Sequence, residues 1–210
     1  MADLITVTNV LGPCATNCYT VVNTETREAV IVDPADRADY LIKMWKEQKF
    51  HPVAVLLTHG HFDHIGALSR IRKEFPDIKV YAGAEEEDVL KSTALNLSEM
   101  FGAAFTEDAD VYVNDGETIA ILGRECKCIH VPGHTKGGIC YYFAEDKIVF
   151  TGDTLFHYSV GRSDFPTGDA KALEENIRTK LLTLPEEVVA YPGHEDRTTI
   201  GKEKAGNPFF

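Results

Sequence analysis

The sequence has few cysteines and no long apolar run. Its five cysteines form no Cys-x-x-Cys pair, which argues against a disulfide framework and favours small buried thiols. No apolar segment approaches the roughly 18 residues that span a bilayer. The start, MADLITVTNV, lacks a basic region followed by an apolar stretch, so it does not resemble a secretory signal. We therefore expect a cytoplasmic protein without a membrane partner.

Positive charge is also scarce. The 21 lysines and arginines are outnumbered by 33 aspartates and glutamates, which gives a net charge of −12. A nucleic-acid surface needs clustered Lys and Arg, so we expect a small-molecule partner and no nucleic acid. Low-complexity tracts and long linkers are missing too. With 210 residues, 44% of them hydrophobic, residues 1–210 are predicted to form a single globular domain.

Strand and helix patterns alternate along the chain. Runs rich in Val, Ile and Tyr predict strands over 4–10, 18–23, 28–34, 53–57, 118–122, 126–131, 138–143, 147–150 and 187–191. Helical spacing of apolar residues predicts helices after residue 36, over 65–75, over 169–184 with Asp169 as N-cap, and near 198–206. The irregular segment 91–110 is predicted to pack in the core, with a flap over a pocket as the alternative. Two packed sheets flanked by helices are expected.

The stretch THGHFDHIG, residues 58–66, places three histidines and an aspartate within six residues. Side chains two positions apart in an extended segment point to the same side, so His59 and His61 converge on one ion. Asp63 and His64 are adjacent and diverge, so a turn into the following helix would aim them at a second position. This loop therefore predicts ligands for two metal ions.

A two-metal site needs about seven ligands, and three more follow other predicted strands. His134 lies in PGHT, Asp153 in TGDT and His194 in PGHE, each directly after an apolar run. The carboxyl ends of neighbouring strands meet at one edge of a sheet, so these side chains are expected to gather there. No site role is assigned to the other histidines, His51, His130 and His157.

These motifs resemble the metallo-β-lactamase superfamily and, within it, the short single-domain glyoxalase II-like hydrolases (hydroxyacylglutathione hydrolases). The resemblance runs nearly end to end, through LGPCATNCY, AVIVDPAD, THGHFDHIG, PGHTKGG, TGDTLFHYSVGRSDFPTGD and YPGHEDRTTIGKEKAGNPFF. It implies an α+β fold, a four-layer αββα sandwich with the site at one edge. Two-domain glyoxalase II enzymes continue into a helical domain that helps to grip glutathione, whereas this sequence stops at NPFF.

The resemblance also implies roles for individual residues. The first metal would be held by His59, His61 and His134. The second would be held by Asp63, His64 and His194. Asp153 would bridge the two ions, Asp33 would lie beside the site and orient it, and the carboxylates of Asp63, Asp153 and Asp33 are the expected catalytic groups. Zinc is the expected metal, although iron and manganese accept the same ligands.

The implied reaction is hydrolysis of a thioester such as S-lactoylglutathione, in which a hydroxide shared by two ions attacks the carbonyl. A basic residue nine positions after the bridging aspartate, here Arg162, would bind the anionic glutathione part. An ion pair between Arg162 and Asp164 is the structural alternative.

Other activities remain open. A mononuclear iron persulfide dioxygenase shares PGHT and a segment like GRSDF, and a lactonase is a weaker third option. A metallo-β-lactamase would carry cysteine at position 153 and an export signal, and the sequence shows neither. A non-enzymatic zinc-stabilised interaction module is an alternative of another class. Structural zinc sites, however, are closed by four ligands, often cysteines, whereas this chain offers seven His and Asp groups.

Overall fold

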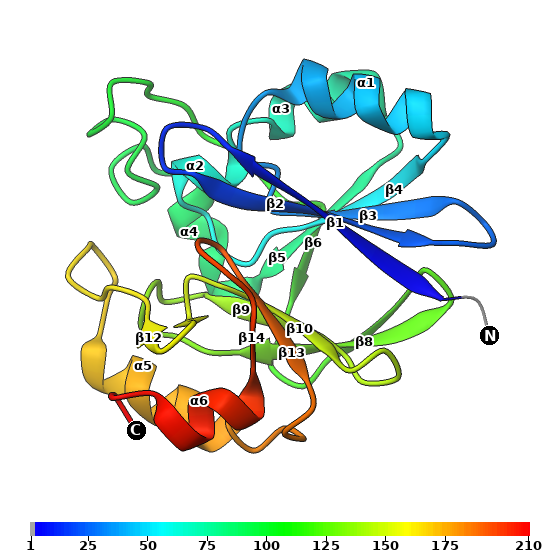
Figure 1. The fold of residues 1–210 in the computed structure, drawn as a ribbon. Coiled ribbons are helices and arrows are strands. Elements are labelled where there is room, and N and C mark those ends of the chain that lie inside the picture. Colours follow the sequence, from blue (N-terminus) through cyan, green and yellow to red (C-terminus); the bar gives the residue numbers. More distant parts are fainter. Residues whose placement is uncertain (1–2) are drawn as a thin grey trace.

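Two six-stranded sheets lie face to face in the computed structural model, which describes residues 3–210 (Figure 1). Helices α1 (Ala38–Gln48) and α3 (Leu68–Glu74) cover the outer face of the first sheet. Helices α5 (Ala170–Asn176) and α6 (Ile200–Gly206) cover the second. The order helix, sheet, sheet, helix confirms the predicted αββα sandwich.

The first sheet is built from the N-terminal half of the chain. Its strands, in spatial order, are β1 (Leu4–Leu11), β2 (Thr16–Asn23), β3 (Glu28–Val32), β4 (His51–Leu56), β5 (Lys79–Gly83) and β6 (Val111–Val113). The first three strands pair antiparallel, and β3 to β6 pair parallel. Because parallel neighbours need a crossover, the chain leaves the sheet after β3, β4 and β5. The predicted strands are present, and β5 and β6 are additional.

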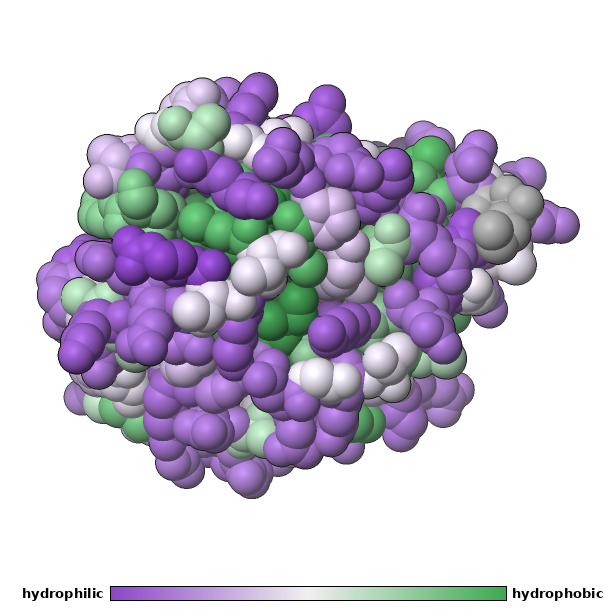
Figure 2. All heavy atoms as spheres, turned by 90° about the horizontal axis from the view of Figure 1, so that it is seen from below, coloured by the Kyte–Doolittle hydropathy of each residue, from purple (hydrophilic) through white to green (hydrophobic). Residues whose placement is uncertain are grey.

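The second sheet is built from the C-terminal half. Its spatial order is β14 (Thr198–Thr199), β13 (Val189–Pro192), β10 (Ile148–Gly152), β9 (Ile139–Phe143), β8 (Arg124–His130) and β7 (Thr118–Ile121). Only β10 and β13 pair parallel. A small hairpin, β11 (Leu155–Phe156) and β12 (Ser159–Val160), follows β10. Seen from below, the face that carries α5 and α6 is mostly hydrophilic, with an apolar strip near its centre (Figure 2).

The predicted helix over 65–75 is in fact two helices, α2 (Phe62–Ile65) and α3. A Cβ on Gly66 would lie 2.4 Å from the carbonyl oxygen of Ala35, so glycine is needed where α2 packs against the chain after β3. The short helices η1 (Ala84–Glu86) and α4 (Glu87–Leu90) follow β5, and a π-helical turn, η2 (Ile177–Leu181), extends α5. Asp169 caps α5, as predicted, because its side chain accepts the amide of Ala172.

Apolar side chains fill the space between the sheets and under each helical layer. Val21, Leu56 and Phe150 meet in the layer between the sheets. On the α1 side, the fully buried indole of Trp45 packs 6.1 Å from the ring of Phe75 and donates to the hydroxyl of Thr20 at 3.0 Å. Within residues 3–210, no helix is long and apolar enough to cross a membrane.

The segment 91–110 divides into parts with different environments. Leu97 is buried and Phe105 packs against the first-sheet core, as predicted. Core packing is wrong for Met100 and Phe101, which are 68% and 55% exposed, whereas the alternative, a flap over a pocket, fits Phe101, which lines a pocket. The loop that carries them is closed by hydrogen bonds from the side chains of Asn96 and Ser98 to the carbonyl of Phe105.

Candidate metal centre

Four loops meet at one edge of the sandwich, and each follows the carboxyl end of a strand. The loop after β4 carries His59, His61, Asp63 and His64, and the loop after β8 carries His134. Asp153 follows β10 and His194 follows β13. The structure therefore brings all seven sequence-predicted ligands together. They come from both sheets, at the edge where β4 of the first sheet and β10 of the second sheet end.

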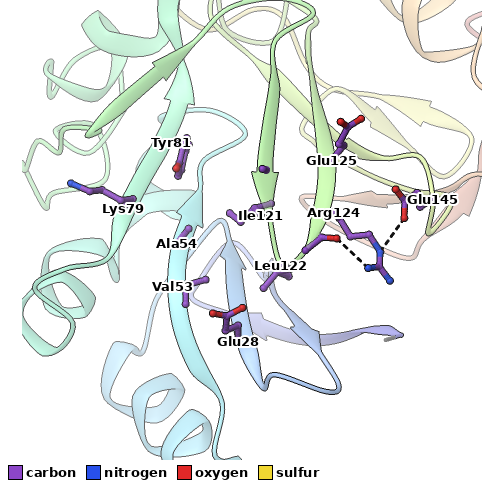
Figure 3. A pocket seen from close by; sticks show the side chains of 12 residues that line it. Glu28, Val53, Ala54, Lys79, Tyr81, Ile121, Leu122, Arg124, Glu125 and Glu145 are labelled. Carbon is purple, nitrogen blue, oxygen red and sulfur yellow. Dashed lines mark hydrogen bonds and ion pairs between the residues drawn. The ribbon is translucent and has the colours of Figure 1, made fainter. Parts of the chain in front are cut away.

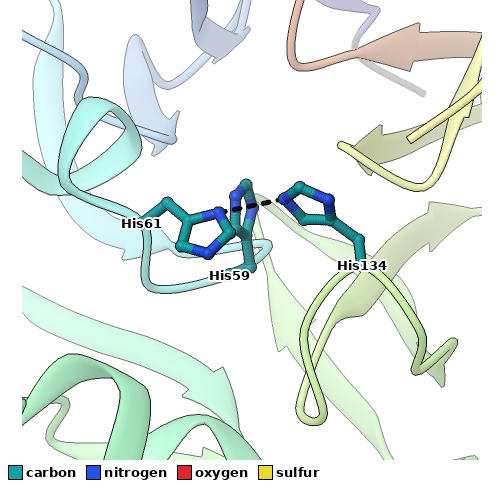
Figure 4. Close-up of side chains that lie close together, drawn as sticks. All are labelled: His59, His61 and His134. Atoms are coloured by element: carbon teal, nitrogen blue, oxygen red, sulfur yellow. Dashed lines mark hydrogen bonds between the residues drawn. The ribbon is translucent and has the colours of Figure 1, made fainter. Parts of the chain in front are cut away.

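The histidines His59, His61 and His134 form the first group of candidate ligands (Figure 4). Their ring centroids are 4.7–4.8 Å apart, with the planes nearly perpendicular. Nε2 of His134 lies 3.0 Å from Nδ1 of His61. All three side chains are buried, and His61 and His134 also line a pocket.

The nitrogens of this group fit a metal ion. The Nε2 atoms of His59 and His61 are buried and have no hydrogen-bond partner among the described residues, although buried polar atoms are normally paired. Burial lowers the pKa of both side chains well below the usual value for histidine, and it also lowers the pKa of His134. Neutral imidazoles with a free lone pair are the form that binds divalent metals.

Asp63, His64 and His194 form a second group beside the first. Oδ2 of Asp63 lies 3.6 Å from Nε2 of His64 and 3.4 Å from Nε2 of His194. Burial alone would lower the pKa of His64, but three neighbouring carboxylates, led by Asp63, raise it well above its usual value. Thr16 donates its hydroxyl to Oδ2 of Asp63 at 2.8 Å. A carboxylate and two imidazoles that converge in this way form a donor set suited to a divalent cation, which would replace the proton that the carboxylates favour on His64.

Asp153 lies between the two groups. Its Oδ2 is 3.6 Å from Nε2 of His134 and 3.4 Å from Nε2 of His194, and its Oδ1 is 3.4 Å from Nε2 of His64. Burial would raise the pKa of Asp153, but the positive charge of His64 and the hydrogen bond from His194 hold it well below its usual range. An ionised carboxylate that reaches both groups occupies the position a bridging ligand requires.

Asp33 lies behind the site. Its Oδ2 is 2.9 Å from Nδ1 of His64 and accepts the hydroxyl of Thr58 at 2.6 Å, while its Oδ1 accepts the backbone amide of Thr58 at 2.8 Å. Asp33, His59 and His64 are also close enough to form a third candidate group. The carboxylate of Asp33 is already engaged by the amide and the hydroxyl of Thr58 and by Nδ1 of His64. We therefore interpret Asp33 as the residue that orients His64 and leaves Nε2 of His64 facing the centre.

Glu86 also belongs to this centre, although no sequence pattern indicated it. Its carboxylate is fully buried and accepts the backbone amide of Gly60 at 2.8 Å and the hydroxyl of Thr135 at 2.9 Å. It therefore links the loop of His59 and His61 to the loop of His134. Burial raises the pKa of Glu86 to about 7. In the sequence it stands within the acidic run EEED, which reads as a solvated surface.

A pocket of about 440 Å³ opens over both groups. Its lining residues are Cys14, His61, Phe62, Asp63, Leu97, Phe101, His134, Asp153, Phe156, Ser159, Val160, Arg162, Phe165, His194 and Glu195. Arg162 lies at this pocket, but its guanidinium donates to both carboxylate oxygens of Asp164, at 2.7 and 2.6 Å. This is the ion pair that the sequence offered as the alternative to substrate binding, so a substrate role for Arg162 stays a prediction.

A second cleft, of about 620 Å³, opens between the sheets along β4, β5, β7 and β8 (Figure 3). Its walls include Val53, Tyr81 and Leu122, and at its rim Nε of Arg124 lies 3.6 Å from Glu145. The residues described along this cleft include no histidine or cysteine. We therefore assign the chemistry to the histidine-lined pocket, although it is the smaller one.

Comparison with known sequences agrees with this geometry. Residues 11–194 match the family model described as the metallo-beta-lactamase superfamily. The chain is 37% identical to "Hydroxyacylglutathione hydrolase GloC" of Haemophilus influenzae, over 92% of each chain. It is 34% identical to "Probable metallo-hydrolase YqgX" of Bacillus subtilis, over 95% of this chain and 94% of the relative.

Solved structures show the same fold. A structure titled as the BLEG-1 B3 metallo-beta-lactamase superposes with a TM-score of 0.92 at 38% identity, over 98% of this chain and 99% of the other. TTHA1623 in a di-iron-bound form superposes with a TM-score of 0.85 at 34% identity, over 97% of this chain and 100% of the other. ETHE1 from Myxococcus xanthus superposes with a TM-score of 0.81 at 29% identity, over 97% of this chain and 83% of the other. With the family model matched over most of its length and His and Asp groups gathered at the strand ends, the chain belongs to the metallo-beta-lactamase superfamily.

Proposed function

We propose that this metal-dependent hydrolase cleaves a thioester, such as S-lactoylglutathione, to a hydroxy acid and a free thiol. The observation that carries the proposal is the pair of three-ligand groups that share Asp153 at the floor of one pocket. The 37% identity to a relative named as a hydroxyacylglutathione hydrolase, across 92% of both chains, supports the thioester as substrate.

In the proposed site, His59, His61 and His134 would hold one divalent cation and Asp63, His64 and His194 a second. When bound, two such cations supply a hydroxide near neutral pH and polarise the acyl carbonyl. Zinc suits this donor set, and the relative solved in a di-iron-bound form supports iron as an alternative.

The chain's own residues keep this donor set in a reactive state. Asp153 stays ionised between the groups, Asp33 orients His64, and Thr16 restrains Asp63. Hydrolysis adds water across the C–S bond, so the acyl carbon gains the hydroxyl and the sulfur takes the proton.

Two further activities deserve a direct test. The segment GRSDF keeps a mononuclear iron persulfide dioxygenase as an alternative. The match to a structure titled as a B3 metallo-beta-lactamase favours β-lactam hydrolysis as a second activity, although position 153 holds aspartate and not the cysteine expected of a metallo-β-lactamase. A non-enzymatic zinc module fits less well, because the candidate ligands line an open pocket instead of a closed four-ligand site.

The test measures metal content of the purified protein by mass spectrometry together with three reactions: S-lactoylglutathione hydrolysis, oxygen uptake with glutathione persulfide, and nitrocefin hydrolysis. We expect about two metal ions per chain and thioester hydrolysis as the fastest reaction. One iron per chain with persulfide-dependent oxygen uptake and no thioester cleavage would overturn the proposal in favour of the dioxygenase.

A further inference from the structure

The walls of the metal-centre pocket differ in chemistry from its floor. The floor is formed by the candidate ligands, whereas much of the remaining lining is apolar, from Phe62, Leu97, Phe101, Phe156, Val160 and Phe165. A pocket built for a strongly polar ligand would place donors and acceptors along its walls. The part of the substrate that extends away from the reacting centre therefore meets mainly hydrocarbon.

One wall of the pocket contains an aromatic pair. The rings of Phe62 and Phe101 stack with centroids 4.4 Å apart and planes 24° apart. Phe62 directly follows the candidate ligand His61, whereas Phe101 comes from the irregular segment after α4. Phe101 remains 55% exposed despite this stacking, so a ligand in the pocket can cover aromatic surface that now faces water. Burying that surface favours binding.

A second aromatic surface is formed by Phe165. Its ring lies 5.8 Å from that of His61, with the planes at 78°. The guanidinium of Arg162 covers one side of the ring, with its central carbon 3.8 Å from the centroid. Arg162 also pairs with Asp164 through two hydrogen bonds. Its charge is therefore already compensated, and its planar group supports the ring instead of standing free for an anion.

The charged residues around the pocket also favour an apolar ligand over an anionic one. Arg162 is the only lysine or arginine among the lining residues that the structure describes. Beyond the candidate ligands, the other charged lining residue is Glu195, which is exposed and acidic. A thiol carrier that bound mainly through its own carboxylates would meet one cation, Arg162, which is already paired with Asp164, and would be repelled by Glu195.

We propose that the substrate carries an apolar acyl group, aliphatic or aromatic, that binds against the Phe62–Phe101 pair and Phe165. This inference rests on the proposed thioester hydrolysis and narrows its substrate class. Recognition then depends on the acyl group more than on an anionic thiol carrier, so S-lactoylglutathione, whose acyl group is small and polar, should be a poorer substrate than a thioester with a longer apolar acyl group.

The experiment uses metal-loaded protein and thioesters of one small neutral thiol, N-acetylcysteamine, with acetyl, butanoyl, hexanoyl and phenylacetyl groups. We expect kcat/KM to rise about threefold to fourfold for each buried methylene, and at least about tenfold from acetyl to hexanoyl. Phe101→Ala should flatten this series, whereas Phe101→Leu should keep part of the slope. The matched control is Tyr40→Ala, which removes an exposed aromatic ring on α1 that does not line the pocket.

A binding measurement separates this inference from the proposed reaction. Calorimetry with uncleavable thioethers, S-methyl- and S-hexyl-N-acetylcysteamine, should show tighter binding of the hexyl compound, and Phe101→Ala should abolish the difference. Thioester cleavage with a flat series and equal thioether affinities would overturn the apolar subsite and leave the hydrolase intact. Chain-length-dependent binding without cleavage of any thioester would instead overturn the thioester reaction.

Discussion

Three of the five histidines at the centre, His64, His134 and His194, are held through the ring nitrogen that does not face the candidate metal. Nδ1 of His64 meets Asp33 at 2.9 Å, Nδ1 of His134 meets the carbonyl of Arg162 at 2.7 Å, and Nδ1 of His194 meets the carbonyl of Cys14 at 3.1 Å. Carbonyl and carboxylate oxygens only accept, so these Nδ1 atoms carry the proton and the Nε2 atoms point inward. Such outer contacts fix the tautomer and the ring orientation before a metal binds.

The first residue-scale prediction concerns Asp33→Asn. Asparagine tolerates the left-handed backbone at this position, where φ is 51°, and it can still accept the amide of Thr58. Its second side-chain atom is an amide nitrogen, which cannot accept the hydrogen bonds that Oδ2 of Asp33 accepts from the hydroxyl of Thr58 and from His64. We expect metal affinity at the second group to fall about 10-fold to 100-fold with little change in helix and sheet content. Competition with a chromophoric chelator measures this, and an unchanged affinity would remove Asp33 from the orienting role.

The second residue-scale prediction concerns Asp153→Ala. Loss of the carboxylate shared by the two groups should reduce bound metal from about two ions per chain to one or fewer, and kcat/KM by at least about 100-fold. The control is Asp169→Ala, which removes the N-cap of α5 and should cost about 1 kcal/mol of stability without loss of metal. If Asp153→Ala keeps normal metal content and turnover, Asp153 is not the shared ligand.

The sequence predicted which His and Asp side chains gather at the strand ends better than it predicted their surroundings. His59, His134 and Asp153 could be found because each follows an apolar strand, and strand ends converge. Glu86 and the Phe62–Phe101 pair could not, because their roles depend on contacts between segments that no periodicity relates. An acidic run and an irregular loop look like ordinary surface until the fold buries one and places the other over a pocket.

At the scale of elements, two loops from different sheets are joined through one buried carboxylate. Glu86, at the end of η1, binds the loop after β4 through Gly60 and the loop after β8 through Thr135. The first candidate metal group draws ligands from both of these loops. Their spacing is therefore set by η1 and not by either strand alone.

The element-scale prediction is that Glu86→Gln weakens metal binding at His59, His61 and His134. Glutamine keeps the size of the side chain but replaces one acceptor with a donor, so one of the two loops loses its contact. We expect metal affinity to fall about 10-fold to 100-fold, again measured by chelator competition. The control is Glu203→Gln, because Glu203 is equally buried but binds Thr198, Asn207 and the amide of Tyr158. It should lose stability and keep metal affinity.

The same variant tests the ionisation of Glu86. Its pKa is raised to about 7 by burial. A carboxyl whose native pKa exceeds its unfolded value stabilises the fold below the unfolded pKa and loses that contribution as the pH rises through the native pKa. The Tm advantage of the wild type over Glu86→Gln, measured without metal, should therefore shrink between about pH 5 and about pH 8. A constant difference would mean that Glu86 is ionised across this range.

Element boundaries were predictable where local chemistry sets them. Asp169 identified the start of α5 because an N-cap is a local signal. The division of 65–75 into α2 and α3 was not predictable, because it depends on the close approach of Gly66 to the backbone of Ala35. Ala35 is about thirty residues earlier in the chain, so the helical pattern of 65–75 contains no sign of this contact. β6 has only three residues and offers too short a pattern to recognise.

At the scale of the whole molecule, the candidate ligands come from both halves of the sandwich. Four belong to the loop after β4 in the first sheet, and three follow strands of the second. Metal ions held by both sets would cross-link the two sheets, and binding to the folded state alone stabilises it.

The whole-molecule prediction is a lower Tm after removal of metal. At a free metal concentration about 100 times Kd, binding adds about 2.7 kcal/mol, which corresponds to a Tm difference of about 5–10 °C for a chain of this size. Calorimetric scans with and without a chelator measure it. The chelator should change the Tm of Asp153→Ala much less, and an equal shift in both proteins would mean that the stabilising ion binds elsewhere.

The packing of Trp45 under α1 has an optical consequence. It is the only tryptophan in the sequence, it is fully buried among first-sheet residues, and it does not line the pocket. Its emission should therefore be blue-shifted and insensitive to ligands, and during melting it should follow the first sheet alone, whereas circular dichroism follows both. Coincident curves would show that the sheets unfold as one cooperative unit. An earlier fluorescence change would show that the N-terminal half loosens first.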